Sequence, residues 1–404
     1  MSSLKVTGVN KVYPSGETAL YDINLEANDK EFLVIAGADG SGKSSLLRVI
    51  AGLEDASSGT VFIDDKDMTE VEPKNRDIAM VFQSSTLYPS LNVFDNMAFG
   101  LRLRKAPEAL VQERVKAVAT ILGLNEVLYR KPKVLTTVAK QRVAIGRAIV
   151  REPKLYLFDE PLSGLDEKLR ADMLNVIVNL QARLEGSFIY ATKNLSEAMT
   201  IGTRIVVMKQ GFVQQVDTPA NLYDYPANTY VAFYIGAPTI NFIKKVKIEK
   251  IEGGYVAKFD GGSLTLHENT VARFEKIEEY ANSGAYVTLG IRPEDIKVEK
   301  EGELKATYDG AVKNAEAYAE VNLNANTPLT VTCNAQAQKG QELTLKVDTA
   351  RLYVFDAVTC LTLLNRDAGY KVTGLPNADF VPLAFNEEEE IHERLKPKKQ
   401  SKKK

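Results

Sequence analysis

The chain has 404 residues, of which 45% are hydrophobic and 26% charged, with 51 basic against 53 acidic side chains. This composition excludes a wholly disordered or collagen-like chain, and the length predicts two or three domains with at least one large core. A net charge of −2 gives no general attraction to nucleic acid, so no nucleic-acid partner is expected. No apolar run approaches the ~20 residues of a membrane-spanning helix. The first residues lack the apolar stretch of a signal peptide, so a cytoplasmic chain with reduced cysteines, Cys333 and Cys360, is expected.

The first region of the sequence, residues 1–235, alternates short β-branched runs with helical patterns. This alternation is typical of a parallel sheet covered by helices. Residues 31–36 and 154–158 are continuously apolar, which predicts strands buried on both faces. Residues 108–122 carry apolar side chains at helical spacing and are predicted to form an amphipathic helix.

The second region, residues 236–365, changes to short strand-like runs separated by Gly, Asn and Asp turns. Examples are residues 285–291, 342–347 and 352–355. This pattern predicts a small β-barrel or sandwich. Residues 366–404 are rich in Glu and then in Lys, so this tail is expected to be solvated, with a disordered end.

A phosphate-binding loop is predicted by the run Gly37-Ala38-Asp39-Gly40-Ser41-Gly42-Lys43-Ser44, which matches G-x-x-x-x-G-K-[ST]. The run follows a predicted strand and opens a helical segment, which Gly52 is expected to end. Backbone N–H groups of such a loop close around a phosphate, and the helix N-terminus favours negative charge there. Lys43 would reach the β- and γ-phosphates, and the Ser44 hydroxyl would ligate Mg²⁺. Asp39 is unusual because a carboxylate in this cradle repels phosphate, so its side chain is expected to point outward.

Two carboxylates follow a buried strand in the run Leu155-Tyr156-Leu157-Phe158-Asp159-Glu160-Pro161. Ligands of open α/β sheets bind at this carboxyl edge of the strands. Asp159 would hold Mg²⁺, directly or through water, and Glu160 is positioned to polarise an attacking water as a general base. A strand ending in Asp-Glu is common, but it becomes a specific signal in a chain that also carries the phosphate loop.

Together these motifs resemble the ATP-binding-cassette (ABC) ATPases, specifically the subunits of carbohydrate importers of the maltose and glycerol-3-phosphate type. The resemblance implies an α/β P-loop NTPase domain at 1–235, with a helical subdomain at about 84–150, followed by an all-β, OB-like regulatory domain at 236–365. It is also carried by Val12-Tyr13-Pro14, Met80-Val81-Phe82-Gln83, Leu162-Ser163-Gly164-Leu165-Asp166 and Gly290-Ile291-Arg292-Pro293-Glu294-Asp295.

The resemblance also implies roles for single residues. Tyr13 would stack on adenine, and Ser45 would join the phosphate loop in binding ATP. Gln83 would contact Mg²⁺ and the attacking water, beside Glu160, and the segment after Gln83 would meet a permease. Asp166 would cross a dimer interface.

The signature segment departs from the family, which has Leu-Ser-Gly-Gly-Gln where this chain has Leu135-Thr136-Thr137-Val138-Ala139. By resemblance, this segment lies at the dimer interface and faces the γ-phosphate that the opposite subunit holds. Thr137 and Val138 place β-branched bulk where the backbone should come close, and a glycine-like conformation there costs about 1–3 kcal/mol. Thr136 or Thr137 can still cap the following helix and offer a hydroxyl.

The second departure is Lys193, which stands at the position of the family's switch histidine. The two histidines of the chain, His267 and His392, lie outside the nucleotide-binding region. A lysine donates to a γ-phosphate as a point charge but accepts no proton. Losing one positioned transition-state contact typically costs ~10²–10³ in rate. ATP binding with weak hydrolysis by the chain alone is therefore expected.

The function that the resemblance implies is an ABC importer's ATP-binding subunit, which couples ATP binding and hydrolysis to uptake of a carbohydrate-type solute. ATP and Mg²⁺ are the implied cofactors. The implied partners are transmembrane permeases, a second ABC ATPase in a homodimer or heterodimer and, indirectly, an extracytoplasmic solute-binding protein. The chain would lie on the inner face of the cell membrane. The two departures leave an alternative open, which is a hydrolysis-impaired regulatory or partnered subunit of such a complex.

Overall fold

The computed structural model describes residues 3–365, except residues 85, 185, 313–316, 325–326 and 334–336. Two compact units follow one another, the first ending at Leu222 and the second beginning at Tyr223. The domain boundary after residue 235 stays a prediction, and the predicted tail at 366–404 lies outside the described residues. Within the described part of the chain, no helix has the length and apolar character needed to cross a bilayer.

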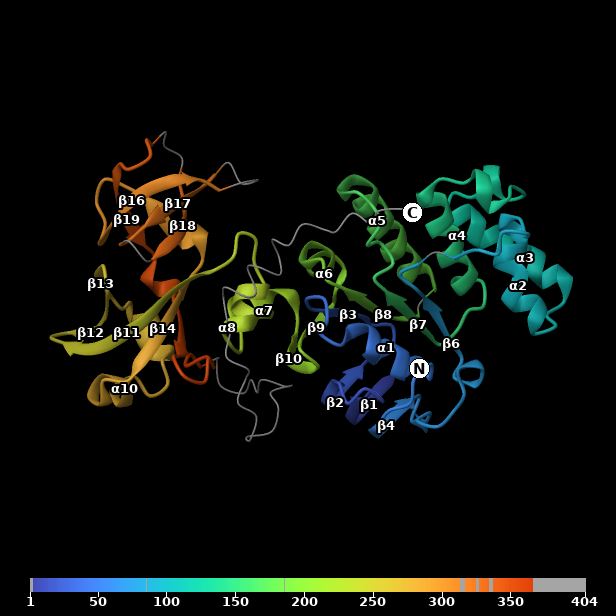
Figure 1. Ribbon diagram of the computed structural model, residues 1–404, viewed down its shortest axis with the longest axis horizontal. Helices are drawn as coiled ribbons and strands as arrows, with labels where there is room; N and C mark the ends of the chain where they lie inside the picture. The colour runs from blue at the N-terminus through green and yellow to red at the C-terminus, as the bar shows by residue number, and fades with distance from the viewer. Residues whose placement is uncertain are drawn as a thin grey trace. The chain divides into compact units, whose positions relative to one another are not determined.

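The first unit is built around a six-stranded sheet in the order β10-β9-β3-β8-β7-β6 (Figure 1). Its strands are β3 (Phe32–Ala36), β6 (Ile78–Val81), β7 (Leu155–Asp159), β8 (Ser187–Thr192), β9 (Arg204–Lys209) and β10 (Phe212–Asp217). Strands β3, β8, β7 and β6 pair in parallel, and β3 and β7 are buried throughout, as their apolar runs predict. Parallel pairing brings the carboxyl ends of these strands to one edge of the sheet.

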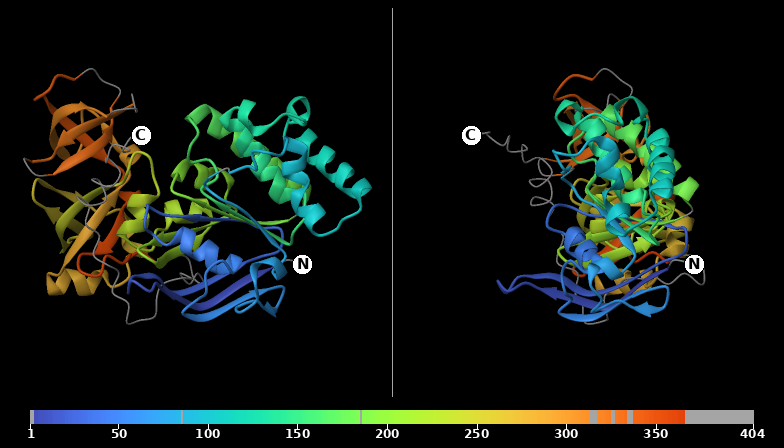
Figure 2. Two further views of the ribbon diagram at one scale, coloured as in Figure 1. Left: turned by 45° about the vertical axis from the view of Figure 1, so that its right-hand side comes forward. Right: turned by 90° about the vertical axis from the view of Figure 1, so that its right-hand side faces the viewer.

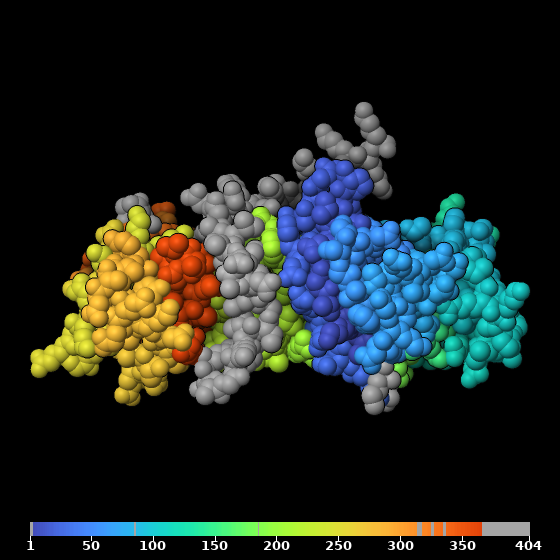
Figure 3. Space-filling model, turned by 90° about the horizontal axis from the view of Figure 1, so that it is seen from below, coloured from blue at the N-terminus to red at the C-terminus, as the bar shows by residue number. Residues whose placement is uncertain are grey.

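A second, antiparallel sheet in this unit has the order β2-β1-β4-β5 and forms an outer surface, blue in Figure 3. Its strands are β1 (Leu4–Val12), β2 (Thr18–Ala27), β4 (Ser58–Ile63) and β5 (Lys66–Asp67). Helix α1 (Lys43–Ala51) shares one buried apolar cluster with β1 and β3, to which it contributes Leu46 and Leu47. The helix ends at Gly52 in the left-handed conformation (φ 70°), which matches the expected stop.

Three helices form a group of their own within the first unit, shown in cyan and teal in Figure 2. They are α2 (Val93–Leu103), α3 (Glu108–Ile121) and α4 (Thr137–Ile149). Helices α2 and α4 pack closely at Gly146, where a Cβ would lie 2.8 Å from the Met97 methyl carbon and the Met97 side chain would have to move. The other helices are α5 (Glu167–Leu184), α6 (Leu195–Ile201) and α7 (Pro219–Asp224), with 3₁₀ turns η1 (Pro73–Asn75), η2 (Asn125–Val127) and η3 (Pro132–Val134).

The second unit contains a five-stranded sheet, β13-β12-β11-β14-β20, and a closed barrel, β15-β18-β17-β16-β19. The sheet strands are β11 (Asn241–Ile251), β12 (Gly254–Phe259), β13 (Gly262–Thr265), β14 (Tyr286–Ile291) and β20 (Tyr353–Asp356). The barrel strands are β15 (Ile296–Val298), β16 (Leu304–Ala311), β17 (Tyr318–Asn322), β18 (Pro328–Thr332) and β19 (Glu342–Val347). Short helices are α8 (Thr229–Tyr234), α9 (Glu268–Arg273), α10 (Ile277–Ser283), η4 (Pro293–Asp295) and η5 (Thr349–Arg351). The small closed barrel agrees with the predicted all-β, OB-like domain.

Arg292 holds the start of the second unit together. Its side chain is fully buried and donates to the carbonyl oxygens of Ala232 (2.9 Å), Ile235 (2.5 Å) and Tyr223 (3.0 Å). The guanidinium also lies 4.0 Å from the centre of the Tyr223 ring, a cation–π contact. One buried side chain therefore donates hydrogen bonds to three backbone carbonyl groups.

We expect Arg292→Ala to lower the free energy of unfolding by about 3 kcal/mol or more, because it leaves buried carbonyl groups without donors. Urea unfolding followed by circular dichroism measures this change. Lys305→Ala is the matched control, since Lys305 is an exposed lysine of the same unit that pairs with Glu342 at 2.9 Å. Equal effects of the two substitutions would contradict the anchoring role.

Candidate functional site

Three loops converge because their strands are neighbours in the parallel sheet. β8 pairs with β3 on one side and with β7 on the other. The phosphate loop follows β3, Glu160 follows β7, and Lys193 follows β8. The predicted phosphate-binding and carboxylate residues therefore meet at one edge, as the sequence predicts for an open α/β sheet.

Backbone geometry requires glycine inside the phosphate loop. Gly42 precedes α1 with φ 97°, and a Cβ there would lie 2.7 Å from the Ala19 carbonyl oxygen. A Cβ on Gly37 would lie 2.4 Å from the Met208 carbonyl oxygen. Gly40 also has a positive φ, 79°. The loop thus takes a path that larger residues cannot follow.

Lys43 lies buried under this loop. Its Nζ donates to the carbonyl oxygens of Gly37 (2.9 Å) and Ala38 (2.8 Å), reaches Ser41 Oγ at 3.4 Å, and lies 3.5 Å from Glu160 Oε1. Burial lowers the pKa of the Lys43 ammonium, and the negative charge of Glu160 opposes that shift. Burial likewise raises the pKa of the Glu160 carboxyl, against the positive charges of Lys43 and Lys193. Lys43 is therefore a buried, poorly hydrated cation, and this suits it to bind an anionic phosphate.

Ser44 and Asp159 meet directly, although they are 115 residues apart in the sequence. The Ser44 hydroxyl donates to Asp159 Oδ1 at 2.7 Å. Hydroxyl and carboxylate oxygens, completed by phosphate and water, are the ligands that Mg²⁺ prefers. Among the described residues, no cluster of three His, Cys, Asp or Glu side chains could hold a metal alone. The Ser44–Asp159 pair therefore fits a Mg²⁺ that arrives with a nucleotide.

Glu160 has an unusual backbone, with φ 43°. A non-glycine residue in this left-handed region is strained by about 1–3 kcal/mol and is typical of functional sites. Its N–H donates to the Ala191 carbonyl oxygen of β8 at 3.0 Å, which fixes the turn after β7. The carboxylate is thereby aimed toward Lys43.

Tyr13 lies beside the first turn of α1. Its hydroxyl is 2.9 Å from Ser45 Oγ and donates to Glu54 Oε2 at 2.8 Å. Lys11 Nζ lies 5.2 Å from the centre of its ring. The structure thus brings Tyr13 to Ser45, the residue that follows Ser44 in the sequence. Stacking of Tyr13 on adenine stays a prediction.

Gln83 and Asp166 are both exposed and lie at loops around the site. Gln83 follows β6 by two residues, and β6 pairs in parallel with β7, so the extended register places Gln83 level with Glu160. No hydrogen bond within the described part of the chain joins Gln83 to Ser44 or Asp159. Asp166 Oδ1 accepts from the Leu169 N–H at 3.0 Å, at the start of α5. Their catalytic and interface roles stay predictions.

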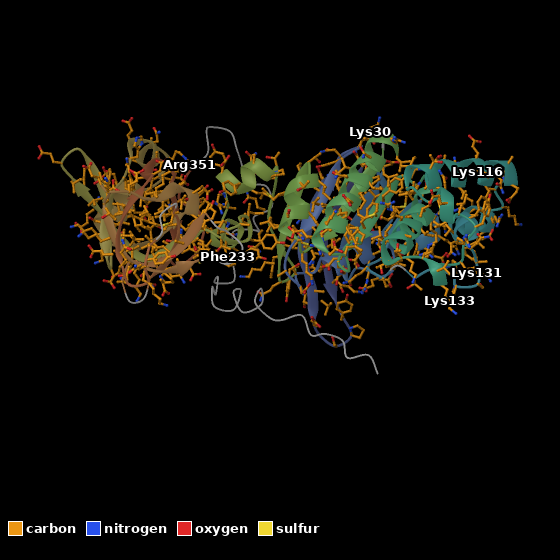
Figure 4. All side chains as sticks on the ribbon, turned by 90° about the horizontal axis from the view of Figure 1, so that it is seen from above. Lys30, Lys116, Lys131, Lys133, Phe233 and Arg351 are labelled. Carbon is orange, nitrogen blue, oxygen red and sulfur yellow. The ribbon has the colours of Figure 1, made fainter. Side chains whose placement is uncertain are left out.

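The signature segment begins a helix. Thr136 Oγ1 accepts from the Ala139 N–H at 3.2 Å and caps α4, whose first two residues are Thr137 and Val138. Helical backbone at these two positions avoids the cost of a glycine-like conformation. Figure 4 shows Lys131 and Lys133, which flank the start of η3 just ahead of this segment, projecting outward. Of the two threonines proposed as caps, Thr136 is the one used.

A buried network that the sequence analysis missed joins the loop after Glu160 to the end of β8. Arg170 donates to the Leu165 carbonyl oxygen (2.8 Å) and lies 3.2 Å from Glu197 Oε1. Glu197 Oε2 accepts from the hydroxyls of Tyr190 (2.9 Å) and Thr192 (2.6 Å). Only the burial of Glu197, 4% exposed, distinguishes it from the chain's many surface carboxylates.

Asp39 points outward, as expected, with a side chain 73% exposed. Its carboxylate accepts two hydrogen bonds from Lys193 Nζ, at 2.7 and 3.0 Å. The residue at the switch position is therefore paired with the phosphate loop itself.

Comparisons with known proteins identify the family of the chain. A family profile described as ABC transporter matches residues 20–163. The oligosaccharides import ATP-binding protein MsmX of Bacillus subtilis is 42% identical over 369 residues, covering 89% of this chain and 99% of that protein. The trehalose/maltose import ATP-binding protein MalK of Thermococcus litoralis is 41% identical over 377 residues, with the same shares covered. Of the solved structures, cbiO1 from Clostridium perfringens, part of an ABC transporter complex, is 30% identical with a TM-score of 0.51, covering 54% of this chain and 89% of that one.

We expect Lys43→Ala to abolish binding of Mg-ATP, because Lys43 is the buried cation under the phosphate loop. Titration calorimetry with Mg-ATP measures the affinity. Lys5→Ala is the control, since Lys5 is an exposed lysine paired with Glu26 at 2.8 Å. An unchanged affinity of the Lys43 variant would contradict the assignment of the phosphate loop.

Proposed function

The chain belongs to the ATP-binding proteins of ABC transporters, and from this premise we propose that it energises the import of a carbohydrate-type solute. The observation that carries the proposal is the similarity to two sugar-import ATP-binding proteins over 99% of their length. Proteins of this family are ATPases. No comparison favours the alternative of a subunit that has lost hydrolysis, so weak turnover by the chain alone stays a prediction.

We assign the steps of ATP hydrolysis to the residues that converge at the sheet edge. Lys43 and the loop from Gly37 to Ser44 would bind the β- and γ-phosphates, with Ser45 and Tyr13 toward the rest of the nucleotide. Ser44 and Asp159, with Gln83, would hold Mg²⁺, which neutralises phosphate charge when bound. Glu160 would orient and polarise the attacking water. The 2.7 Å Ser44–Asp159 contact and the 3.5 Å Lys43–Glu160 pair support these roles.

A groove of about 600 Å³ in the first unit supports a docking site for a permease. Its walls come from the end of α1, η1, β6, α2 and the segment after α4. The lining residues are Ala51, Leu53, Pro73, Lys74, Ile78, Met80, Phe82, Gly100, Leu103, Arg104 and Arg151. Most of them are apolar, and Leu103 (75%), Leu53 (48%) and Phe82 (41%) are exposed. Exposed apolar surface of this kind marks a protein interface.

The groove is adjacent to Gln83, because Phe82 in its wall is the preceding residue. Three basic residues line it, of which Lys74 pairs with Glu72 at 2.6 Å and Arg104 lies 3.7 Å from Asp77, and the third is Arg151. Burial lowers the pKa of the Arg151 guanidinium, and the positive charge of Arg104 adds to that shift. We therefore assign to the groove a permease helix with one apolar face and an acidic residue.

The assembly that we propose contains two ATP-binding subunits, either two copies of this chain or one copy and a second ABC ATPase. Thr136, Thr137, Val138, Ala139 and Asp166 would lie at that interface. The chain would sit on the inner face of the membrane through its permeases, and an extracytoplasmic solute-binding protein would act with it indirectly. Deleting the gene in its native organism and measuring uptake of labelled oligosaccharides tests this function. Restoration of uptake by the intact gene but not by Lys43→Ala is expected, and uptake unaffected by the deletion would refute it.

Leu103→Glu is expected to weaken binding to the permeases at least tenfold while ATP affinity stays unchanged, because it places a charge in an apolar contact. Co-purification with membrane partners measures the association. Val358→Glu, at a residue 81% exposed outside the groove, is the control. Equal retention of partners by both variants would remove the groove from the interface.

Turnover of the chain alone is expected to be low, because a homodimer carries the altered signature and Lys193 at both sites. Combining Lys193→His with Thr136→Ser, Thr137→Gly, Val138→Gly and Ala139→Gln should raise turnover more than either part alone. A single restored transition-state contact is worth ~10²–10³ in rate. Steady-state phosphate release at saturating Mg-ATP measures it. A wild-type rate that these substitutions do not improve would show that neither departure limits hydrolysis.

A further inference from the structure

The ion pair between Asp39 and Lys193 connects two parts of the site that lie 154 residues apart. Both oxygens of the carboxylate accept from the same ammonium, at 2.7 and 3.0 Å. The side chains are 73% and 41% exposed, respectively. Exposed pairs of this kind add little to stability. A role in folding therefore does not account for an acidic residue in a loop that binds phosphate.

The pair lies at the terminal-phosphate end of the site. Lys43 Nζ contacts the carbonyl oxygens of Gly37 and Ala38, the two residues directly before Asp39. The lysine of such a loop reaches the β- and γ-phosphates. Ser45 and Tyr13 mark the other end, toward the rest of the nucleotide. Asp39 is thus near the place where a triphosphate carries charge that a diphosphate lacks.

Two lysines face two carboxylates around this end of the site. Lys43 pairs with Glu160 at 3.5 Å, and Lys193 pairs with Asp39 at 2.7 Å. Without Lys193, Asp39 would be an uncompensated negative charge beside an arriving γ-phosphate. We expect the repulsion between the Asp39 carboxylate and the γ-phosphate to weaken nucleotide binding about tenfold in a partly hydrated site.

We propose that Asp39 and Lys193 act as one neutral unit, in which Lys193 is the counter-ion that allows this loop to accept a nucleoside triphosphate. Lys193 is then a positioning and specificity residue for the terminal phosphate, and its function depends on Asp39. The inference rests on the proposed ATP-binding function. It predicts that the two substitutions cancel each other.

Full-length protein with Asp39→Asn, Lys193→Gln or both is titrated with Mg-ATP and, separately, with ADP. Lys193→Gln should weaken ATP binding about tenfold, Asp39→Asn should strengthen it several-fold, and the double variant should return to within about threefold of the wild type. ADP affinity should change less than about threefold in all three. Unchanged thermal unfolding shows that the variants fold, and Lys5→Gln controls for loss of an exposed paired lysine.

Failure of Asp39→Asn to restore ATP binding to the Lys193→Gln variant would overturn the proposal, since the loss caused by Lys193→Gln would then not come from an uncompensated Asp39. Equal weakening of ATP and ADP binding would also overturn it, because the terminal phosphate would not be the group sensed. Unchanged ATP affinity in every variant would do the same. A wild-type protein that binds neither nucleotide would instead refute the proposed function, so the two failures are distinguishable.

Discussion

Parallel hydrogen bonding of β8 between β3 and β7 is the constraint on which the site depends. It brings the phosphate loop, Lys193 and Glu160 to one edge of the sheet from three distant parts of the sequence. Because side chains alternate between the two faces of a strand, a slip of one residue in β7 would move Asp159 to the wrong face and away from Ser44. Because both faces of β3 and β7 are buried, their register is fixed by the packing of side chains of particular size and shape on each face and not by an apolar–polar alternation. The positions of the site residues therefore depend on the hydrophobic core beneath them.

The charges at this edge are arranged in opposing pairs because burial penalises each of them alone. Lys43, with 4% of its side chain exposed, has two loop carbonyls and Glu160 as partners. Glu160, 11% exposed, sits on a strained backbone that β8 fixes. Removing one partner from such a pair leaves the other charge buried and uncompensated, which is strongly unfavourable.

Sequence patterns predicted those parts of the structure that depend on residues close together in the sequence. The run 108–122 became α3 (Glu108–Ile121), and residues 342–347 form β19 as predicted. The family, the fold class and the meeting of Ser44 with Asp159 were accessible because a local motif implies each of them. The Asp39–Lys193 pair and the burial of Glu197 were not, because both arise where separate segments pack. The exposed Gln83 and Asp166 show the remaining limit, since the roles predicted for them involve groups outside this chain.

The contacts of Arg170 have a mechanical consequence. Through the Leu165 carbonyl and Glu197, this side chain ties the loop before α5 to the end of β8, with Tyr190 and Thr192 bonded to the same carboxylate. Separating the two loops would break the hydrogen bond from Arg170 to the Leu165 carbonyl oxygen and the Arg170–Glu197 ion pair, whose side chains are 20% and 5% exposed, so we expect the two loops to move together. A displacement of the loop before α5 is therefore expected to reach the end of β8, directly before Lys193.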